Sequence, residues 1–272
     1  MSNNTILITG SSTGIGKSTA KFFHENGWNV IATMRSPEKE DELTKLDNVL
    51  VTRLDVTDLD SIQQAINAGI EKFGKIDALV NNAGYGAYGP LESFPRESIL
   101  RQFNTNVIGL LDVTRAILPH FRANKNGVIV NISSIGGKIT FPLGTLYHGT
   151  KFAVEGISEA LSHELAEFGC QVKIVEPGAI ETDFAGRSFD FNNDESLQEY
   201  QGIVQKLMSG FEKALAQTSK PIVVVKVIYE AVTDGKDKLR YAAGEDAVAL
   251  LNARKELDDA TFISNLKAQF SL

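Results

Sequence analysis

Short apolar runs alternate with longer amphipathic stretches along almost the whole chain. The runs are continuous and do not alternate between apolar and polar residues, which is typical of strands covered on both faces of a parallel sheet. Helical periodicity fills the segments between the runs. The pattern therefore predicts an α/β chain with a parallel sheet and helices on both faces.

The pattern gives seven expected strands and six expected helices. The strands are expected at residues 5–10, 29–33, 48–55, 77–84, 127–134, 171–178 and 240–244. The helices are expected at residues 14–26, 38–46, 58–73, 98–122, 147–168 and 221–233. No linker, repeat or low-complexity tract is visible, so residues 1–272 are predicted to form one domain.

Residues 183–220 form one irregular zone, between the sixth expected strand and the next helix. Long segments of this kind in a compact domain are usually functional, so we expect a substrate lid there. A C-terminal extension is expected at about residues 245–272.

Composition and charge exclude several classes of protein. The chain has 272 residues, 43% of them hydrophobic, and a formal net charge of −7, which argues against a nucleic-acid partner. The only cysteine, Cys170, is predicted to be buried in the core. The N-terminus resembles no secretory signal, and the most apolar late stretch is too short to span a membrane and contains Lys226. A cytoplasmic protein without a transmembrane segment is expected, and no metal site is predicted.

A glycine-rich turn, TGSSTGIGKS, follows the first expected strand and opens a helix. Gly10, Gly14 and Gly16 would let the backbone approach a pyrophosphate at the helix N-terminus. A P-loop is disfavoured because five residues separate Gly10 from Gly16, where that motif has four. A purely structural glycine turn remains the alternative.

Tyr147 and Lys151 stand four residues apart, one helical turn, after a run of loop-forming residues. The simple interpretation is a surface pair on an ordinary helix. The catalytic interpretation is a phenol that donates or accepts a proton beside a fixed positive charge.

These motifs together resemble the short-chain dehydrogenase/reductase family, in its compact single-domain branch, over roughly residues 5–245. The resemblance rests on motifs that fall in order at the ends of the expected strands: T-G-x-x-x-G-x-G from Thr9, N-N-A-G from Asn81, the Asn of NTNVIG, Ser134, Y-x-x-x-K from Tyr147 and P-G-x-x-x-T from Pro177. His148 is the unusual residue, and we expect it on a helix face near a subunit contact.

The resemblance implies a Rossmann-type doubly wound sheet and hydride exchange between a nicotinamide and a carbonyl or alcohol carbon. It also implies a homodimer or homotetramer, joined through the helices that contain Asn106 and Tyr147. The cofactor-binding residues that it implies are Gly10, Ser12, Gly14, Ile15, Gly16, Arg35, Ser36, Asp55, Val56, Asn82, Ala83, Gly84, Tyr147, Lys151, Pro177, Gly178, Ile180 and Thr182.

Four residues are expected to carry the chemistry. Tyr147 would give a proton to the substrate oxygen, where negative charge develops as the hydride arrives. Lys151, at about 5 Å, would lower the pKa of Tyr147 by about two units. Ser134 would bind the substrate oxygen, with Ser133 as the alternative serine. Asn106 would support a water chain to Lys151, or would be a structural kink residue.

The end of the second expected strand bears on the choice between NADP(H) and NAD(H). Met34 stands where an acid would bind the ribose 2′-hydroxyl, and Arg35 and Ser36 follow, suited to a 2′-phosphate. Glu38 and Glu40 are expected in a helix and turned to solvent. NADP(H) is therefore favoured, with a non-discriminating Arg35 stacked over adenine as the alternative.

The irregular zone suggests a hydrophobic ketone, aldehyde or secondary alcohol as substrate. The sequence also resembles hydroxysteroid and retinoid dehydrogenases of the family. Packing of the lid to the core is the alternative role for its apolar residues, and a catalytically idle dinucleotide-binding regulator is the alternative function. The residues expected around the substrate are Tyr85, Phe141, Leu143, Phe184, Phe189, Phe191, Tyr200, Met208 and Phe211.

Overall fold

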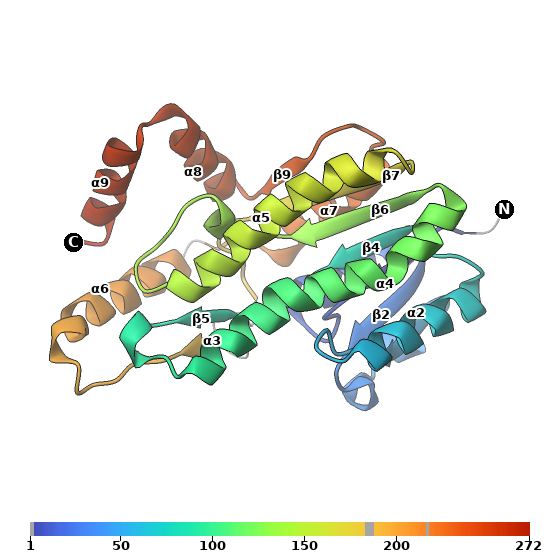
Figure 1. The fold of residues 1–272 in the computed structure, drawn as a ribbon, viewed down its shortest axis with the longest axis horizontal. Coiled ribbons are helices and arrows are strands. Elements are labelled where there is room, and N and C mark those ends of the chain that lie inside the picture. The colour runs from blue at the N-terminus through green and yellow to red at the C-terminus, as the bar shows by residue number, and fades with distance from the viewer. Residues whose placement is uncertain (1–2, 183–187, 216–217) are drawn as a thin grey trace.

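The computed structural model of the chain describes residues 3–182, 188–215 and 218–272. Seven strands form one parallel sheet, in the order β3-β2-β1-β4-β6-β7-β9 (Figure 1). The strands are β1 (Thr5–Ile8), β2 (Asn29–Met34), β3 (Val49–Arg53), β4 (Ala78–Asn81), β6 (Gly127–Ile132), β7 (Cys170–Pro177) and β9 (Arg240–Ala243). This arrangement confirms the predicted single-domain, doubly wound α/β fold and all seven expected strands.

Helices cover both faces of the sheet, as predicted. In Figure 1, α2 (Leu59–Phe73), α4 (Gly109–Asn124) and α5 (Thr145–Ala166) cross the near face. The far face carries α1 (Gly14–Glu25) and α7 (Pro221–Thr233), which contact each other. Each face buries its own apolar cluster, so the strand side chains are enclosed on both sides.

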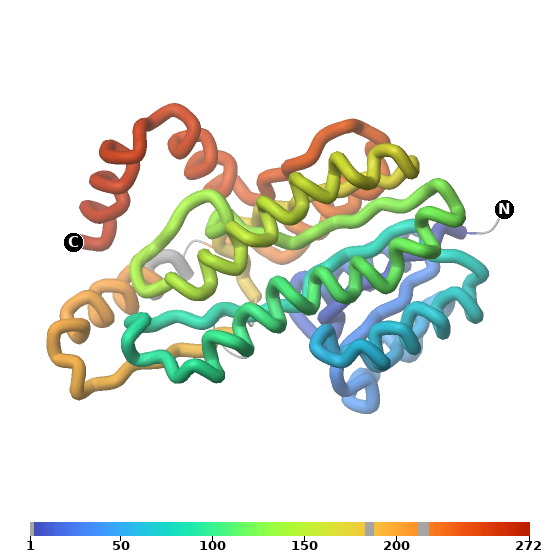
Figure 2. Tube along the Cα trace, viewed as in Figure 1, coloured from blue at the N-terminus to red at the C-terminus, as the bar shows by residue number. Residues whose placement is uncertain are grey.

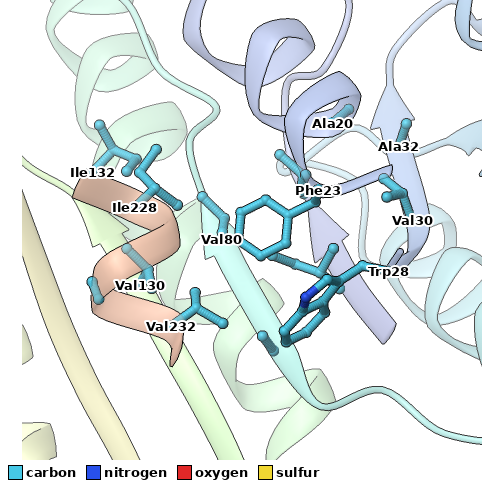
Figure 3. Packing of buried hydrophobic residues seen from close by; sticks show 14 of the residues in the cluster. Ala20, Phe23, Trp28, Val30, Ala32, Val80, Val130, Ile132, Ile228 and Val232 are labelled. Atoms are coloured by element: carbon cyan, nitrogen blue, oxygen red, sulfur yellow. The ribbon is translucent and has the colours of Figure 1, made fainter. Parts of the chain in front are cut away.

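Phe23 is at the centre of the cluster on the α1 and α7 face, as Figure 3 shows. Its ring meets the Trp28 ring edge-on at 5.2 Å between centroids, and Ile228 of α7 belongs to the same cluster. On the opposite face, Cys170 is 4% exposed and belongs to the α2, α4 and α5 cluster, which confirms its predicted burial.

The predicted helix at residues 38–46 is wrong. The segment contains two short 3-10 turns, η1 (Pro37–Lys39) and η2 (Leu43–Lys45). The Glu40 carboxylate accepts hydrogen bonds from the backbone N–H groups of Glu42 and Leu43, both at 2.9 Å, and this local bonding competes with a continuous helix. Glu40 is 8% exposed, so its predicted orientation toward solvent is also wrong.

The segment predicted as one helix over residues 98–122 is interrupted. It consists of α3 (Arg96–Phe103), a π-helical turn at Asn104–Ile108 and α4. Pro95 precedes the first residue of α3, which fits the preference of proline for helix starts. The π-helical turn contains Asn106, and single turns of this kind are frequent at functional sites.

The remaining elements gather at the end of the molecule away from the N-terminus (Figure 2). Here β5 (Gly86–Tyr88) pairs in parallel with β8 (Phe189–Phe191), which the sequence did not predict. The irregular zone also contains α6 (Gln198–Leu215), and the C-terminal extension forms α8 (Glu245–Glu256) and α9 (Asp259–Gln269). Two further 3-10 turns are η3 (Leu91–Ser93) and η5 (Ile135–Gly137).

None of the described helices is both long enough and apolar enough to cross a membrane.

Candidate active site

The predicted site residues lie where the order of the sheet reverses. β1 has β2 on one side and β4 on the other, so the chain leaves these strands in opposite directions. Open α/β sheets bind ligands in the crevice outside the carboxyl ends of the strands at such a point. Four predicted parts of the site lie at the carboxyl ends of strands: the glycine-rich turn, Asn82–Gly84, Ser134 and residues 177–182.

Close packing requires glycine in the turn after β1. Gly10 and Gly14 have φ values of +69° and +55°. A Cβ on Gly16 would lie 2.3 Å from the Gly10 carbonyl oxygen. Asn82 ties this turn to the end of β4, because its side-chain amide donates to the Gly10 oxygen at 3.1 Å. Ala83 donates its N–H to the Thr9 hydroxyl at 3.0 Å.

The N-terminus of α1 is open to an anion. Thr13 is the N-cap residue, but its side chain makes no capping hydrogen bond, and the first turn of the helix holds no acid. The positive end of the helix dipole and the free N–H groups are therefore available. Ser12 lies in the turn, and Ile15 packs against the core beneath it. This geometry fits a dinucleotide pyrophosphate.

Arg35 stands exposed directly after β2, with Ser36 beside it. Among the residues that the structure describes, Arg35 has no hydrogen-bond or ion-pair partner. Lys17 of α1 differs, because its ammonium pairs with Glu40 at 3.2 Å and with Glu42 at 2.8 Å. Arg35 is thus free to meet an added anion, whereas Lys17 is neutralised.

The residues expected beside adenine are already engaged with the protein. The Asp55 carboxylate accepts hydrogen bonds from the backbone N–H and the hydroxyl of Thr57, at 3.0 and 2.8 Å. Val56 is 7% exposed and packs against Gly109. Their contact with adenine stays a prediction.

The P-G-x-x-x-T segment begins where β7 ends at Pro177. Ile180 forms an isolated β-bridge with Ser219, and the Thr182 hydroxyl donates to the Ile180 carbonyl oxygen at 3.5 Å. A Cβ on Gly14 would lie 3.6 Å from Cβ of Thr182, so this segment borders the glycine-rich turn. The fold therefore brings the two ends of the predicted cofactor site together.

Tyr147, Ser134 and Lys151 form one cluster. Tyr147, in the first turn of α5, is 9% exposed, and its phenol and the Ser134 hydroxyl share a hydrogen bond. The Lys151 ammonium lies 5.8 Å from the centre of the Tyr147 ring and donates to the Ile132 carbonyl oxygen at 2.9 Å. Ser133 differs from Ser134, because its buried hydroxyl has no hydrogen-bond partner among the described residues.

Burial dominates the electrostatics of this cluster. It raises the pKa of Tyr147, and the hydrogen bond with Ser134 acts in the opposite direction. Burial also lowers the pKa of Lys151 to about 8, against the opposing effect of the Glu155 carboxylate. The pKa of Tyr147 is thus shifted in the direction opposite to the two-unit lowering expected from the sequence, with desolvation of the phenol as the largest cause.

Asn106 is held by the protein at both ends of its amide. Its Nδ2 donates to the Tyr85 carbonyl oxygen at 2.8 Å and to the Thr150 hydroxyl at 3.1 Å. Its Oδ1 accepts the Tyr85 N–H at 3.1 Å and lies against Gly84. The side chain thus has the structural role at the helix kink, and its part in a water chain stays a prediction.

His148 is buried within the chain, and its predicted nearness to a subunit contact stays a prediction. It is 3% exposed and bonds to two residues of the preceding loop. Its Nε2 accepts the Phe141 N–H at 2.9 Å, and Nδ1 lies 2.9 Å from the Gly136 carbonyl oxygen. Since Nε2 accepts, Nδ1 carries the proton and donates. Burial lowers the pKa of His148 to about 4, so the ring is neutral and fixes the loop that precedes Tyr147.

An aromatic cluster encloses Tyr147. The Tyr88 ring lies 5.5 Å from the Tyr147 ring and stacks on Phe189 at 5.3 Å. Phe211 meets Tyr88 edge-on at 5.4 Å. Among the residues that the structure describes, the cluster consists of Tyr88, Leu143, Tyr147, Phe189, Phe191, Leu207, Phe211 and Phe270.

The sequence predicted only part of this aromatic cluster. It missed Tyr88, Leu207 and Phe270, because each comes from an element whose position depends on the tertiary fold. Tyr200 and Met208 were expected there and lie elsewhere: Tyr200 donates to Glu92 at 3.3 Å, and Met208 is 40% exposed. The remaining expected residues are Tyr85, which bonds to Arg101, Phe141, which packs near Phe270, and Phe184, which lies outside the described residues.

Known proteins are similar to this chain in sequence. A family model described as short chain dehydrogenase matches residues 4–193. An uncharacterized oxidoreductase of Schizosaccharomyces pombe is 46% identical over 239 residues, which is 88% of this chain and 100% of that protein. A 3-ketodihydrosphingosine reductase of Bacteroides thetaiotaomicron is 42% identical over 179 residues, which is 66% of this chain and 65% of that protein.

Solved structures agree with the sequence relatives. A short-chain dehydrogenase from Streptomyces avermitilis matches with a TM-score of 0.82 at 34% identity, covering 97% of this chain and 98% of that chain. ElxO with NADP bound matches with a TM-score of 0.75 at 30% identity, covering 91% of this chain and 99% of that chain. The chain is therefore an oxidoreductase that belongs to the short-chain dehydrogenase/reductase family.

Proposed function

We propose that this protein is an NADP(H)-dependent oxidoreductase that interconverts a hydrophobic ketone or aldehyde with its alcohol. The observation that carries the proposal is the Tyr147 phenol, which bonds to Ser134, lies near Lys151 and is covered by aromatic side chains. Such a site holds a proton donor against an apolar substrate.

The cofactor would lie across the carboxyl ends of β1, β4 and β7. The glycine-rich turn and the α1 N-terminus would hold the pyrophosphate, and residues 177–182 would hold the nicotinamide carboxamide. Arg35 and Ser36 would bind a 2′-phosphate, and the related ElxO structure contains NADP. When bound, the cofactor supplies or accepts a hydride at the substrate carbon.

The side chains of this protein would then donate and replace the proton. Tyr147 donates its phenol proton to the substrate oxygen, and its raised pKa keeps that proton in place at neutral pH. Ser134 donates a hydrogen bond to the same oxygen and positions the carbonyl. Lys151 supplies positive charge beside the phenolate that remains, and Asn106 supports the route by which Lys151 exchanges protons with water.

A hydrophobic substrate follows from the surroundings of Tyr147. Apart from the Tyr147 phenol itself, the cluster around it offers mostly aromatic and leucine side chains, so a charged substrate would lose hydration without gaining partners there. A related protein is a 3-ketodihydrosphingosine reductase, whose name denotes a ketone. The intact Ser134, Tyr147 and Lys151 cluster argues against an idle regulator.

A panel of carbonyl compounds tests the proposed function. With NADPH, we expect specificity constants for bulky apolar ketones to exceed those for short charged 2-oxoacids by about tenfold or more, because apolar area is buried only by the former. The absorbance of the reduced nicotinamide of NADPH measures turnover. Faster reduction of the 2-oxoacids would contradict the proposed substrate class, and no turnover of any carbonyl would contradict the proposed reaction.

We also propose that the protein is cytoplasmic and forms a homodimer or homotetramer through α4 and α5. Apolar side chains stand exposed near these helices: Phe103 is 36%, Ile108 is 47% and Phe152 is 46% exposed. Phe103 lies over α5, since its ring is 3.5 Å from the position of a Cβ on Gly149. Sedimentation at micromolar concentration should give a dimer or tetramer, and a pure monomer would contradict this.

A further inference from the structure

We propose that Asp246, at the start of α8 in the C-terminal extension, is a positioning residue for the nicotinamide half of the cofactor. It would act by fixing the backbone of residues 178–182, which border the glycine-rich turn. This inference rests on the proposed function, because it assigns Asp246 to the dinucleotide site described above.

A direct hydrogen bond joins Asp246 to that backbone. The Ala179 N–H donates to Asp246 Oδ2 at 2.7 Å, although the two residues are 67 positions apart. Carboxylate acceptors make stronger hydrogen bonds than neutral ones. The C-terminal extension therefore reaches back to the segment that directly follows β7.

The same peptide unit is held from its other side. The Ala179 carbonyl oxygen accepts the Ser219 N–H at 2.9 Å, and the Ser219 carbonyl oxygen accepts the Glu181 N–H at 2.8 Å. Asp246 supplies the N–H partner, so both polar groups of Ala179 are bonded to residues distant in sequence. Loss of Asp246 would leave the Ala179 N–H without this acceptor, and the segment would keep its hydrogen bonds with Ser219 and the one from the Gly178 N–H to the Ala243 carbonyl oxygen at 3.1 Å.

Two glycines make room for this carboxylate. A Cβ on Gly178 would lie 2.1 Å from Asp246 Oδ2, and a Cβ on Gly244 would lie 2.5 Å from Oδ1. Gly244 also has a φ of +118°, which side chains rarely adopt. The carboxylate is thus enclosed between the end of β7 and the end of β9.

Asp246 does not act as a cap for its own helix. The N-cap of α8 is Gly244, which has no side chain, and the described residues provide no hydrogen-bond partner for the buried Oδ1 of Asp246. An acid that served only to stabilise α8 would bond to the free N–H groups of the first turn. This one bonds to the loop instead.

The experiment compares whole cofactors with their adenine halves. Calorimetry on the full chain gives separate Kd values for NADPH and its adenine half 2′,5′-ADP, and for NADH and its adenine half 5′-AMP. Asp246→Ala should raise the Kd of the preferred dinucleotide about tenfold, which corresponds to the loss of one hydrogen bond to a charged group. It should change the Kd of the adenine half less than twofold. Asp246→Asn keeps an acceptor oxygen for Ala179 and should stay within about threefold of the wild type.

Glu245→Ala is the matched control, since Glu245 is the exposed neighbouring acid in the first turn of α8. It removes the same charge and should change neither Kd. Equal losses of dinucleotide and adenine half in Asp246→Ala, no loss at all, or loss of both through unfolding would overturn the role of Asp246. Wild-type protein that binds neither dinucleotide would instead overturn the proposed function.

Discussion

Replacing Tyr147 with Phe should lower kcat for carbonyl reduction about a thousandfold, within the range expected when a positioned proton donor is lost. The substitution removes one hydroxyl and keeps the ring that packs against Tyr88 at 5.5 Å. It also removes the hydrogen bond between the phenol and the Ser134 hydroxyl. Since the glycine-rich turn and Arg35 are untouched, the Kd for the cofactor should stay within about threefold. Single-turnover kinetics and cofactor titration measure the two quantities.

Tyr88→Phe is the matched control for that prediction. Tyr88 is 5% exposed and belongs to the same aromatic cluster, but it is the neighbour of the proposed proton donor. Removing the Tyr88 hydroxyl should leave kcat within about tenfold of the wild type. Wild-type turnover in the Tyr147 variant, or an equal loss in both variants, would show that Tyr147 is not the proton donor.

The pH dependence of the wild-type reaction provides a second check on the same assignment. Reduction needs the protonated phenol, and burial raises the pKa of Tyr147, so this requirement is met at neutral pH. It also needs positive charge on Lys151, whose pKa burial lowers to about 8. As pH rises through that value the charge is lost, so kcat/KM for reduction should fall above about pH 8. Alcohol oxidation needs the phenolate, so kcat/KM for oxidation should rise with pH.

The parallel sheet and the order of its motifs could be predicted from the sequence because they depend on local signals. Continuous apolar runs mark strands that are covered on both faces, and glycines mark the turns that follow them. The motif at Tyr147 and Lys151 sits on one helix, so its spacing alone places both side chains on one face. Local pattern and global fold agree in these elements.

Hydrogen bonds between polar side chains and the backbone decided the parts that could not be predicted. Glu40 belongs to an apparently helical segment, but its carboxylate bonds to two backbone N–H groups and pairs with Lys17, so the segment forms turns. His148 carries no sequence signal of burial, yet its ring is bonded to the preceding loop on both nitrogens. In each case a polar side chain found distant or nonhelical partners that periodicity does not encode.

The shape of the candidate substrate site likewise depends on contacts between elements that are distant in sequence. β5 and β8 are three residues each, and their pairing brings Phe189 beside Tyr88. The ion pair of Arg101 with Asp190 also joins α3 to β8. Phe270 enters the aromatic cluster from the chain end, where Gly210 leaves room for its ring. Sequence could indicate that apolar residues were available, but their meeting point depends on how β5, α5, β8, α6 and the chain after α9 come together.

Replacing Arg35 with Ala should raise the KM for NADPH by about 10- to 100-fold and leave the KM for NADH within about twofold. A bidentate hydrogen bond from a guanidinium to a phosphate contributes about 1.5 to 3 kcal/mol, which corresponds to that range. Arg35 is exposed and unpaired among the described residues, so the substitution breaks no contact within the protein. Lys17 cannot substitute for it, because Glu40 and Glu42 already hold its ammonium. Steady-state kinetics with both cofactors measure the change.

Lys39→Ala separates binding by Arg35 from a general effect of charge. Lys39 is an exposed cation in η1, four residues further along the same connection, and its loss changes the net charge by the same amount. If Arg35 binds the 2′-phosphate directly, Lys39→Ala should shift the NADPH KM less than threefold, and added salt should not erase the difference between the two variants. Equal losses in both variants would indicate long-range attraction. Equal effects of Arg35→Ala on NADPH and NADH would indicate stacking on adenine, and the missing acid at buried Met34 would then have no bearing on cofactor choice.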